Sequence, residues 1–156
     1  MINLSTNYYF FTKDKDVASK YAPDSYTLVD TPDFGYEIHI GKRSAGWLPL
    51  LQAHKQGMCS VKDFKDAYNT GKFQIYNENM EWLDWDTLNE ELFQFNGGRD
   101  GVIPKTYHEV DKDAIFYDPD MPCYTPVSHF TYGNGKHAYM YFKDPEGFEF
   151  SGKEFL

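Results

Sequence analysis

Residues 39–47 contain the side chains of this sequence whose types and spacing best suit chemistry. The run reads His-Ile-Gly-Lys-Arg-Ser-Ala-Gly-Trp, and residues 38–57 include no carboxylate although the chain as a whole is acidic. Small residues let backbone N–H groups approach an anion closely, and nearby cations add charge. We therefore predict a site for a small molecule such as a nucleotide or another anion, formed by His39, Lys42, Arg43, Ser44, Trp47 and His54, with His54 as a candidate general base.

A purely structural interpretation of the same run stays open. Gly41 and Gly46 would shape a turn, Trp47 would anchor the core, and the two cations would be solvated at the rim. The run is not a P-loop, because residue 36 is Tyr where that motif requires a glycine. No stretch of the chain matches a catalytic motif closely enough to name a reaction.

A second candidate surface combines carboxylates with two indole rings. Spaced carboxylates resemble a row of phosphates electrostatically, so such a surface could occupy a basic groove on another protein. The alternative is a solvated helix face beside two core tryptophans. The candidate partner-binding residues are Glu81, Trp82, Asp84, Trp85, Asp86, Glu90 and Glu91.

Metal binding has little support in the spacing of potential ligands. No two of the five histidines are four residues apart, and the pair His129 and His137 on one predicted hairpin lacks a third ligand. Asp111, Asp113, Asp118 and Asp120 lack the spacing of an EF-hand loop. Cys59 and Cys123 form no Cys-x-x-Cys motif and are predicted to be free thiols. We predict no metal and no cofactor.

The elements that must position these residues form an α+β fold. The length of 156 residues, 41% of them apolar, fits a single domain over residues 1–156, with a mainly antiparallel sheet and about two short helices. Alternation of apolar and polar residues in the 36–42 segment places His39 on the face opposite Ile38 and Ile40.

Periodicity and turn residues predict the individual elements. Helices are expected at 61–69, after an N-cap at Ser60, and at 87–95, after an N-cap at Asp86. Residues 99–126 are expected to form a long irregular excursion. Strands are expected at 8–11, 25–30, 36–42, 47–51, 73–76, 80–83, 128–132, 136–142 and 148–151.

The charge balance bears on partners and location. The chain has 24 Asp and Glu against 15 Lys and Arg, a formal charge of -9, which repels nucleic acid and argues against general binding of DNA or RNA. A protein with a basic surface is the more natural partner. No run of residues has the length and apolarity of a membrane span or the pattern of a signal peptide, so a cytoplasmic location is expected.

Residues 36–47 resemble a family of uncharacterised small bacteriophage proteins, in which one strand reads His-Ile-Gly-Lys-Ser-Ser-x-Gly-Trp. The opening Asn7-Tyr8-Tyr9 and the closing residues 147–155 are also similar to that family. Many members have a Cys-x-x-Cys before this strand, but the equivalent residues 13–34 here have no cysteine, so no metal is implied. Arg43 stands in place of the usual serine, and Ser44 is the hydroxyl that remains.

The resemblance implies a phage or prophage source and no established activity. Together with the acidic charge, it predicts a phage accessory protein that binds a host or host-defence component in the host cytoplasm without catalysis. The alternative is a domain or small enzyme that binds a small molecule at residues 39–47. A virion component is a third class that the sequence leaves open.

Overall fold

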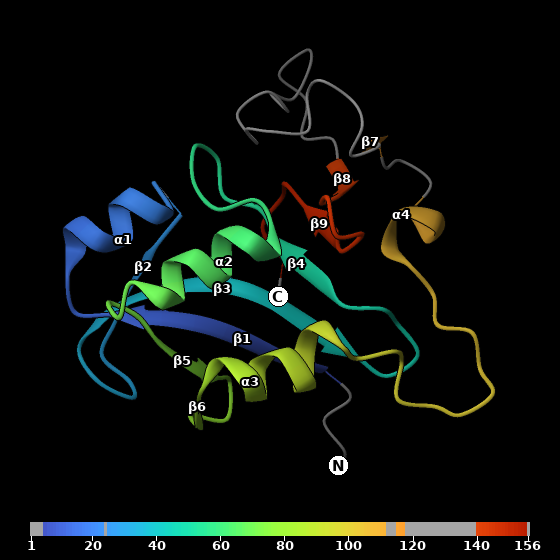
Figure 1. Cartoon of the computed structure of the whole chain (residues 1–156), viewed down its shortest axis with the longest axis horizontal. Coiled ribbons are helices and arrows are strands. Elements are labelled where there is room, and N and C mark those ends of the chain that lie inside the picture. The colour runs from blue at the N-terminus through green and yellow to red at the C-terminus, as the bar shows by residue number, and fades with distance from the viewer. Residues whose placement is uncertain (1–4, 24, 112–114, 118–139, 156) are drawn as a thin grey trace.

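The computed structural model describes residues 5–23, 25–111, 115–117 and 140–155. These residues form an α+β fold around one mainly antiparallel, nine-stranded sheet with the order β6-β5-β1-β3-β4-β9-β8-β7, in which β2 pairs with β3 beside this path (Figure 1). Two neighbouring pairs are parallel, β4 with β9 and β7 with β8. The strands are β1 (Ser5–Thr12), β2 (Thr27–Val29), β3 (Gly35–Ser44), β4 (Leu50–Gln52), β5 (Gln74–Asn77), β6 (Trp82–Leu83), β7 (Ile115–Tyr117), β8 (Met140–Lys143) and β9 (Glu149–Ser151).

The part of the chain that the structure describes has more helices than the two expected. They are α1 (Lys15–Tyr21), α2 (Val61–Asn69), α3 (Trp85–Leu88) with the π-helical turn η1 (Asn89–Phe93), and α4 (Tyr107–Val110). Helices α1 and α4 were not predicted, because seven and four residues are too few to show a clear period of apolar residues.

The two predicted helices are present, and one of them has a different cap. Helix α2 begins after Ser60, whose Oγ accepts the N–H of Asp63 at 3.0 Å, as expected. The predicted cap at Asp86 is wrong, because α3 begins two residues earlier than expected, after an N-cap at Asp84. The Asp84 carboxylate accepts the N–H of Thr87 at 2.8 Å, and Asp86 lies in the first turn.

Several predicted strands have shifted bounds. The strand expected at 47–51 is β4, which begins only after Pro49, while Trp47 makes an isolated bridge with Lys105. The excursion expected at 99–126 contains α4 and β7 within its described part. Most of the hairpin expected at 128–142, with His129 and His137, lies outside the described residues, as do Asp113, Asp118, Asp120 and Cys123.

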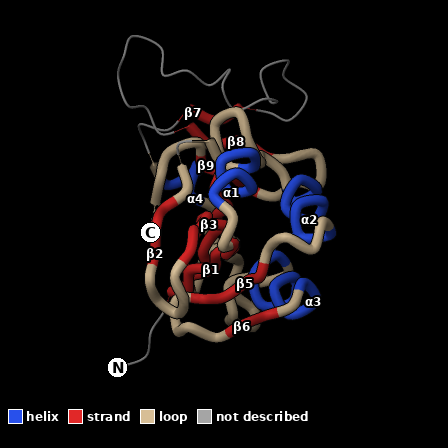
Figure 2. The backbone as a smooth tube through the Cα atoms, turned by 90° about the vertical axis from the view of Figure 1, so that its left-hand side faces the viewer, coloured by secondary structure: helices blue, strands red, loops and turns tan. Residues whose placement is uncertain are grey.

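The core lies between one face of the sheet and the helices. Figure 2 shows α2 and α3 on one side of the strands, with β2 and the C-terminus on the other side. Phe10 of β1 contacts Phe64 of α2, with ring centroids 6.0 Å apart, and Ile38 and Ile40 of β3 are fully buried in the same cluster. We call this side the helix face. The opposite side is the outer face, where Tyr9 contacts the rings of His39 and Tyr76.

A β-bulge in β3 decides which side chains share the outer face. Tyr8 pairs with Gly41 and Tyr9 pairs with His39, so Ile40 is an extra residue without its own partner on β1. Side chains beyond a bulge are displaced by one position in the alternation. Lys42, which pairs with Asn7, therefore lies on the same face as His39, and Arg43 lies on the helix face.

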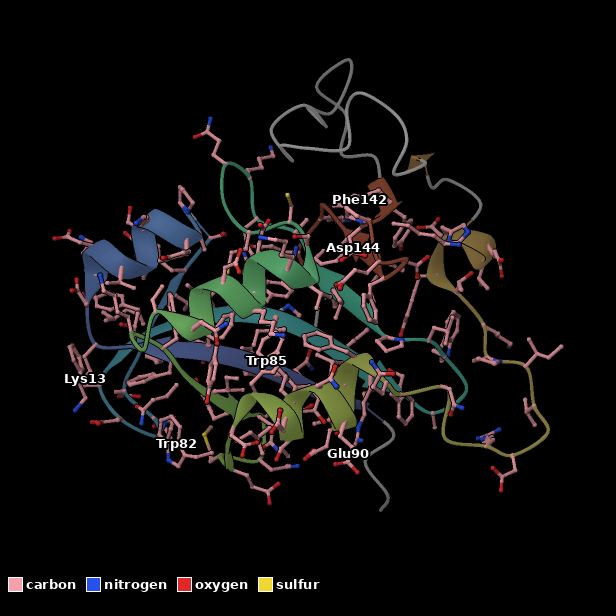
Figure 3. The ribbon with its side chains drawn as sticks, in the orientation of Figure 1. Lys13, Trp82, Trp85, Glu90, Phe142 and Asp144 are labelled. Atoms are coloured by element: carbon pink, nitrogen blue, oxygen red, sulfur yellow. The ribbon has the colours of Figure 1, made fainter. Side chains whose placement is uncertain are left out.

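A buried carboxylate joins the C-terminal strands to α2. Asp144, next to Phe142 in the β8–β9 hairpin, is fully buried (Figure 3). Its oxygens accept N–H groups from Val61 at 2.9 Å, Phe148 at 2.9 Å and Glu146 at 3.1 Å. Burial raises the pKa of Asp144, and these hydrogen bonds act in the opposite direction. The turn between β8 and β9 is therefore also a tertiary contact with α2.

We predict that Phe64→Ala strongly destabilises the protein. The Phe64 ring is fully buried and contacts Phe10, Phe93 and Phe150, so truncation leaves a cavity that costs about 3–5 kcal/mol. Urea unfolding measures the change. Phe34→Ala is the matched control, because the Phe34 side chain is 63% exposed and its loss should cost less than about 0.5 kcal/mol. Equal effects of the two substitutions would contradict this placement of the core.

Candidate functional site

A pocket of about 590 Å³ opens on the outer face. It brings together His39 of β3 and His54 of the loop after β4, two of the six residues predicted to bind a small molecule or an anion. The remaining walls come from β1, β2, the segment after α1 and the C-terminal residues. The lining residues are Tyr9, Pro23, Ser25, Thr27, Glu37, His39, Gln52, Ala53, His54, Lys55, Gly152, Glu154 and Phe155.

His54 is held by hydrogen bonds on both ring nitrogens. Its Nε2 donates to the backbone carbonyl of His39 at 2.8 Å, because a carbonyl oxygen only accepts. Its Nδ1 lies 2.7 Å from Oγ of Ser25, and in this tautomer it accepts the hydroxyl proton. Only 2% of the residue is exposed, and burial lowers the pKa of His54 to about 4. His54 is therefore neutral at pH 7.

His39 faces two amide oxygens. Its Nε2 lies 2.8 Å from Oδ1 of Asn7, and its Nδ1 lies 3.3 Å from Oε1 of Gln52. The Gln52 amide is fixed in this orientation because its two N–H groups are shared among three carbonyl oxygens, those of Ala53, Ser151 and Lys153. Burial lowers the pKa of His39 to about 4, against the effect of the Gln52 oxygen. We assign the proton to Nε2, which makes the shorter contact.

A carboxyl group and two phenols lie near the histidines on the outer face. Glu37 of β3 accepts a hydrogen bond from the Tyr76 hydroxyl of β5. Burial raises the pKa of Glu37, and the same hydrogen bond opposes that shift. Burial and the neighbouring carboxylates raise the pKa of Tyr9 to about 12. The outer face therefore has both hydrogen-bond donors and acceptors near the histidines, and these groups are partly shielded from water.

Three other residues of the predicted site lie in a row beside the pocket. The Nζ of Lys42 is 5.5 Å from the ring centroids of both Tyr107 and Phe155, and Phe155 also contacts the His39 ring at 4.8 Å. Trp47 stacks on Tyr107 with centroids 4.5 Å apart. Ser44 lies 2.8 Å from the hydroxyl of Ser5 and also hydrogen-bonds Tyr107. None of these three lines the pocket itself.

Arg43 is separated from the other predicted site residues. It lies on the helix face, where its Nη1 donates to the Glu91 carbonyl at 3.1 Å and its guanidinium is 5.3 Å from the Phe95 ring centroid. The structure thus divides the cations of the 39–47 run between two faces. Gly41, in the same run, cannot carry a side chain without a steric clash, because a Cβ there would lie 2.6 Å from the Leu50 carbonyl oxygen.

The seven predicted partner-binding residues are divided between surface and interior. Trp82 of β6 is 46% exposed, and Glu81, Asp84, Asp86 and Glu90 are also exposed. Figure 3 shows Trp82 and Glu90 well apart in this view. Two residues point inward. Trp85 contacts Tyr68 and Phe93, and Glu91 accepts a hydrogen bond from the Tyr8 hydroxyl at 3.2 Å.

A larger hollow of about 890 Å³ lies between α2 and α3. Its walls are polar and of mixed charge, with Lys62, Lys65 and Asp66 opposite Asp84 and Asp86. The Lys62 and Asp66 side chains form an exposed ion pair at 2.7 Å. The outer-face pocket is the better candidate site despite its smaller volume, because only there do buried titratable groups and aromatic rings converge.

Within the described residues, no three His, Cys, Asp or Glu side chains are grouped so that they could hold a metal ion. None of the helices described is long and apolar enough to cross a membrane. The buried thiol of Cys59 donates to Oδ2 of Asp63 at 3.6 Å. Comparisons with protein-family models, with curated proteins and with solved structures find no match to this chain.

Sequence reasoning missed several residues of the pocket. Tyr9, Ser25, Glu37, Gln52 and Phe155 come from five separate segments, and only Glu37 had a usable signal. It stands two residues before His39 on the same strand, and residues two apart in a strand share a face.

The buried His54 and the half-buried His39 predict acid sensitivity. Their pKa values of about 4 in the folded state lie below the ordinary 6.5, so the unfolded chain binds more protons between these limits. The free energy of unfolding should therefore be highest above pH 6.5 and fall as the pH drops toward 4, by up to about 3 kcal/mol per histidine. Urea unfolding over this pH range measures the loss.

His54→Gln should make the stability less dependent on pH. The glutamine amide can still donate to the His39 carbonyl but does not titrate. Both proteins contain the same carboxyl groups, including Glu37 and Asp144. The contribution of these groups to the pH dependence therefore cancels in the comparison. The same loss of stability in both proteins on acidification would contradict the burial of a neutral His54.

Proposed function

We propose that the protein binds a small molecule in the outer-face pocket. The observation that supports this proposal best is the meeting of the half-buried His39 and the buried His54, both hydrogen-bonded, with aromatic rings in one concave site. A volume of about 590 Å³ is within the usual range for small-molecule sites.

The walls favour a flat ring as the ligand. The ring centroids of Tyr9 and Phe155 lie 5.4 Å and 4.8 Å from that of His39, so aromatic surface flanks the histidine. Hydroxyl groups of Ser25 and Thr27 and the carboxyl of Glu37 add hydrogen-bonding capacity. A heterocycle that donates hydrogen bonds fits this combination of stacking surface and oxygen acceptors.

The charge of the walls favours a ligand without negative charge. The described lining includes two carboxyl groups, Glu37 and Glu154, and one ammonium group, that of Lys55. The two histidines add no positive charge at pH 7, because their pKa values are about 4. A phosphate would meet more negative than positive charge. Anion binding by residues 39–47 stays a separate prediction.

A nucleoside should therefore stabilise the protein more than its monophosphate. A ligand that binds only the folded state raises the thermal midpoint, by about 5 °C when present at a hundred times its Kd. A thermal-shift titration of adenosine, guanosine and cytidine against their monophosphates makes the comparison. A larger shift with the monophosphates would support the anion prediction, and no shift with any probe would count against the pocket.

Phe155→Ala should abolish the nucleoside shift, because it removes the ring that contacts His39. Phe34→Ala removes an exposed ring that does not line the pocket and should leave the shift unchanged. Both variants are compared with their own midpoints without ligand.

We propose, as a second function, that this is a phage accessory protein that binds a basic protein of the host or its defences in the host cytoplasm. The favouring observation is the 46% exposure of Trp82 on the edge strand β6, with exposed Glu81 directly before it and exposed Asp86 and Glu90 in the α3 and η1 segments that follow. Exposed indole rings are frequent binding hot spots, and surrounding carboxylates select a basic partner.

Replacing this surface should remove a bound partner. Trp82→Ala combined with Glu90→Lys should lower recovery of a co-purified basic protein by about tenfold or more at low salt. Quantitative mass spectrometry of affinity-purified complexes measures the recovery, with Phe34→Ala as the control. Equal recovery with both variants, or no basic partner at low salt, would reject this second function.

A further inference from the structure

Ser25 and His54 form a hydrogen-bonded pair at the wall of the outer-face pocket. The Ser25 Oγ lies 2.7 Å from Nδ1 of His54, and both residues line the pocket. Ser25 is only half-buried, so its hydroxyl lies at the boundary between the pocket and the buried imidazole. The pair thus has a reachable oxygen and a protected nitrogen.

A third group fixes the orientation of the imidazole. The His39 carbonyl accepts the Nε2 proton of His54 at 2.8 Å, which leaves Nδ1 as the nitrogen with a lone pair. On the other side, the backbone N–H of Ser25 donates to the Ala22 carbonyl at 3.1 Å and holds the serine in the turn after α1. A hydroxyl, a base and a group that orients the base are the three roles of an activated serine.

We propose that Ser25 is a nucleophile, with His54 as its general base, for the hydrolysis of uncharged carboxylic esters bound in this pocket. The proposal rests on the small-molecule site proposed above and names a substrate class for it. Only the roles, and not a sequence motif, resemble those of serine hydrolases.

The reaction is balanced with water as the second reactant. The Ser25 oxygen forms a bond to the ester carbonyl carbon while its proton passes to Nδ1 of His54. Collapse of the tetrahedral intermediate breaks the bond to the alkoxide, which takes the proton from Nδ1 and leaves as the alcohol. Water then gives a proton to Nδ1, attacks the acyl carbon and releases the carboxylic acid, and the proton returns to the Ser25 oxygen.

The other walls suit this chemistry and limit the substrate. Lys55 lines the pocket and brings the positive charge that a tetrahedral oxyanion requires. Pro23, Ala53 and Phe155 supply apolar surface for the acyl or alcohol group. Glu37 and Glu154 disfavour substrates that carry a carboxylate, so uncharged esters are the expected class.

A fluorophosphonate probe tests the nucleophile directly, because it forms a stable covalent bond with activated serine hydroxyls. We expect intact-protein mass spectrometry to show a single addition, and peptide mapping to place it on Ser25. Ser25→Ala should lose the addition. Ser5→Ala, which removes a serine hydroxyl outside the pocket, should be labelled like the unchanged protein. No addition, or an addition at another residue, would overturn the proposal.

His54→Gln separates activation by the base from simple access to the serine. It should slow labelling of Ser25 by about a hundredfold or more, since general-base catalysis contributes that much. Circular dichroism confirms that each variant is folded. If His54→Gln is not folded, hydrolysis of p-nitrophenyl acetate by the unchanged protein and by Ser25→Ala decides, and equal rates reject the nucleophile.

Failure of this inference can be told from failure of the binding proposal. A nucleoside thermal shift that persists in Ser25→Ala, without labelling of the unchanged protein, keeps the pocket as a binding site and rejects the reaction. If the unchanged protein shows neither a nucleoside thermal shift nor labelling of Ser25, both the binding proposal and the reaction are rejected.

Discussion

The extra residue in β3 is the constraint on which the candidate site depends. Because Ile40 has no partner of its own on β1, the alternation of β3 shifts by one position between His39 and Lys42. Ile38 and Ile40 both stay in the core, while His39 and Lys42 share the outer face and Arg43 reaches the helices. A regular strand would have placed Lys42 toward the core, at a large cost in desolvation. Gly41 completes the arrangement, since a side chain there would collide with β4.

The two histidines connect this strand to the rest of the outer face. His54 bonds the backbone of β3 through one nitrogen and the segment after α1 through the other, so one buried ring joins three parts of the chain. His39 joins β3 to β1 through its hydrogen bond to the Asn7 amide oxygen, and its other nitrogen lies 3.3 Å from the Gln52 amide oxygen of β4. Burial of polar rings is tolerable only because their nitrogens have partners. Burial, and not these hydrogen bonds, keeps both histidines neutral at pH 7, because desolvation lowers their pKa values to about 4 while the hydrogen bonds act in the opposite direction.

The acidic surface illustrates how charge and packing separate residues that are adjacent in sequence. Asp84 caps α3, Trp85 packs against α2, and Glu91 turns inward to Tyr8, so each has a structural role. Trp82, Glu81, Asp86 and Glu90 stay exposed on the surface. A partner could therefore contact only part of the run that composition singles out.

The sequence by itself determined the α+β class, the capped helix α2, the strand around His39 and the placement of His39 opposite Ile38 and Ile40, because these depend on local periodicity and on caps. It did not reveal α1 or α4, which are too short for a clear period, nor the correct cap of α3. Only the tertiary structure decided that His39 meets His54, Ser25 and Phe155 while Arg43 departs. The physical reason is that a bulge and long-range strand pairing set these positions, and neither produces a periodic pattern of residues in a single sequence.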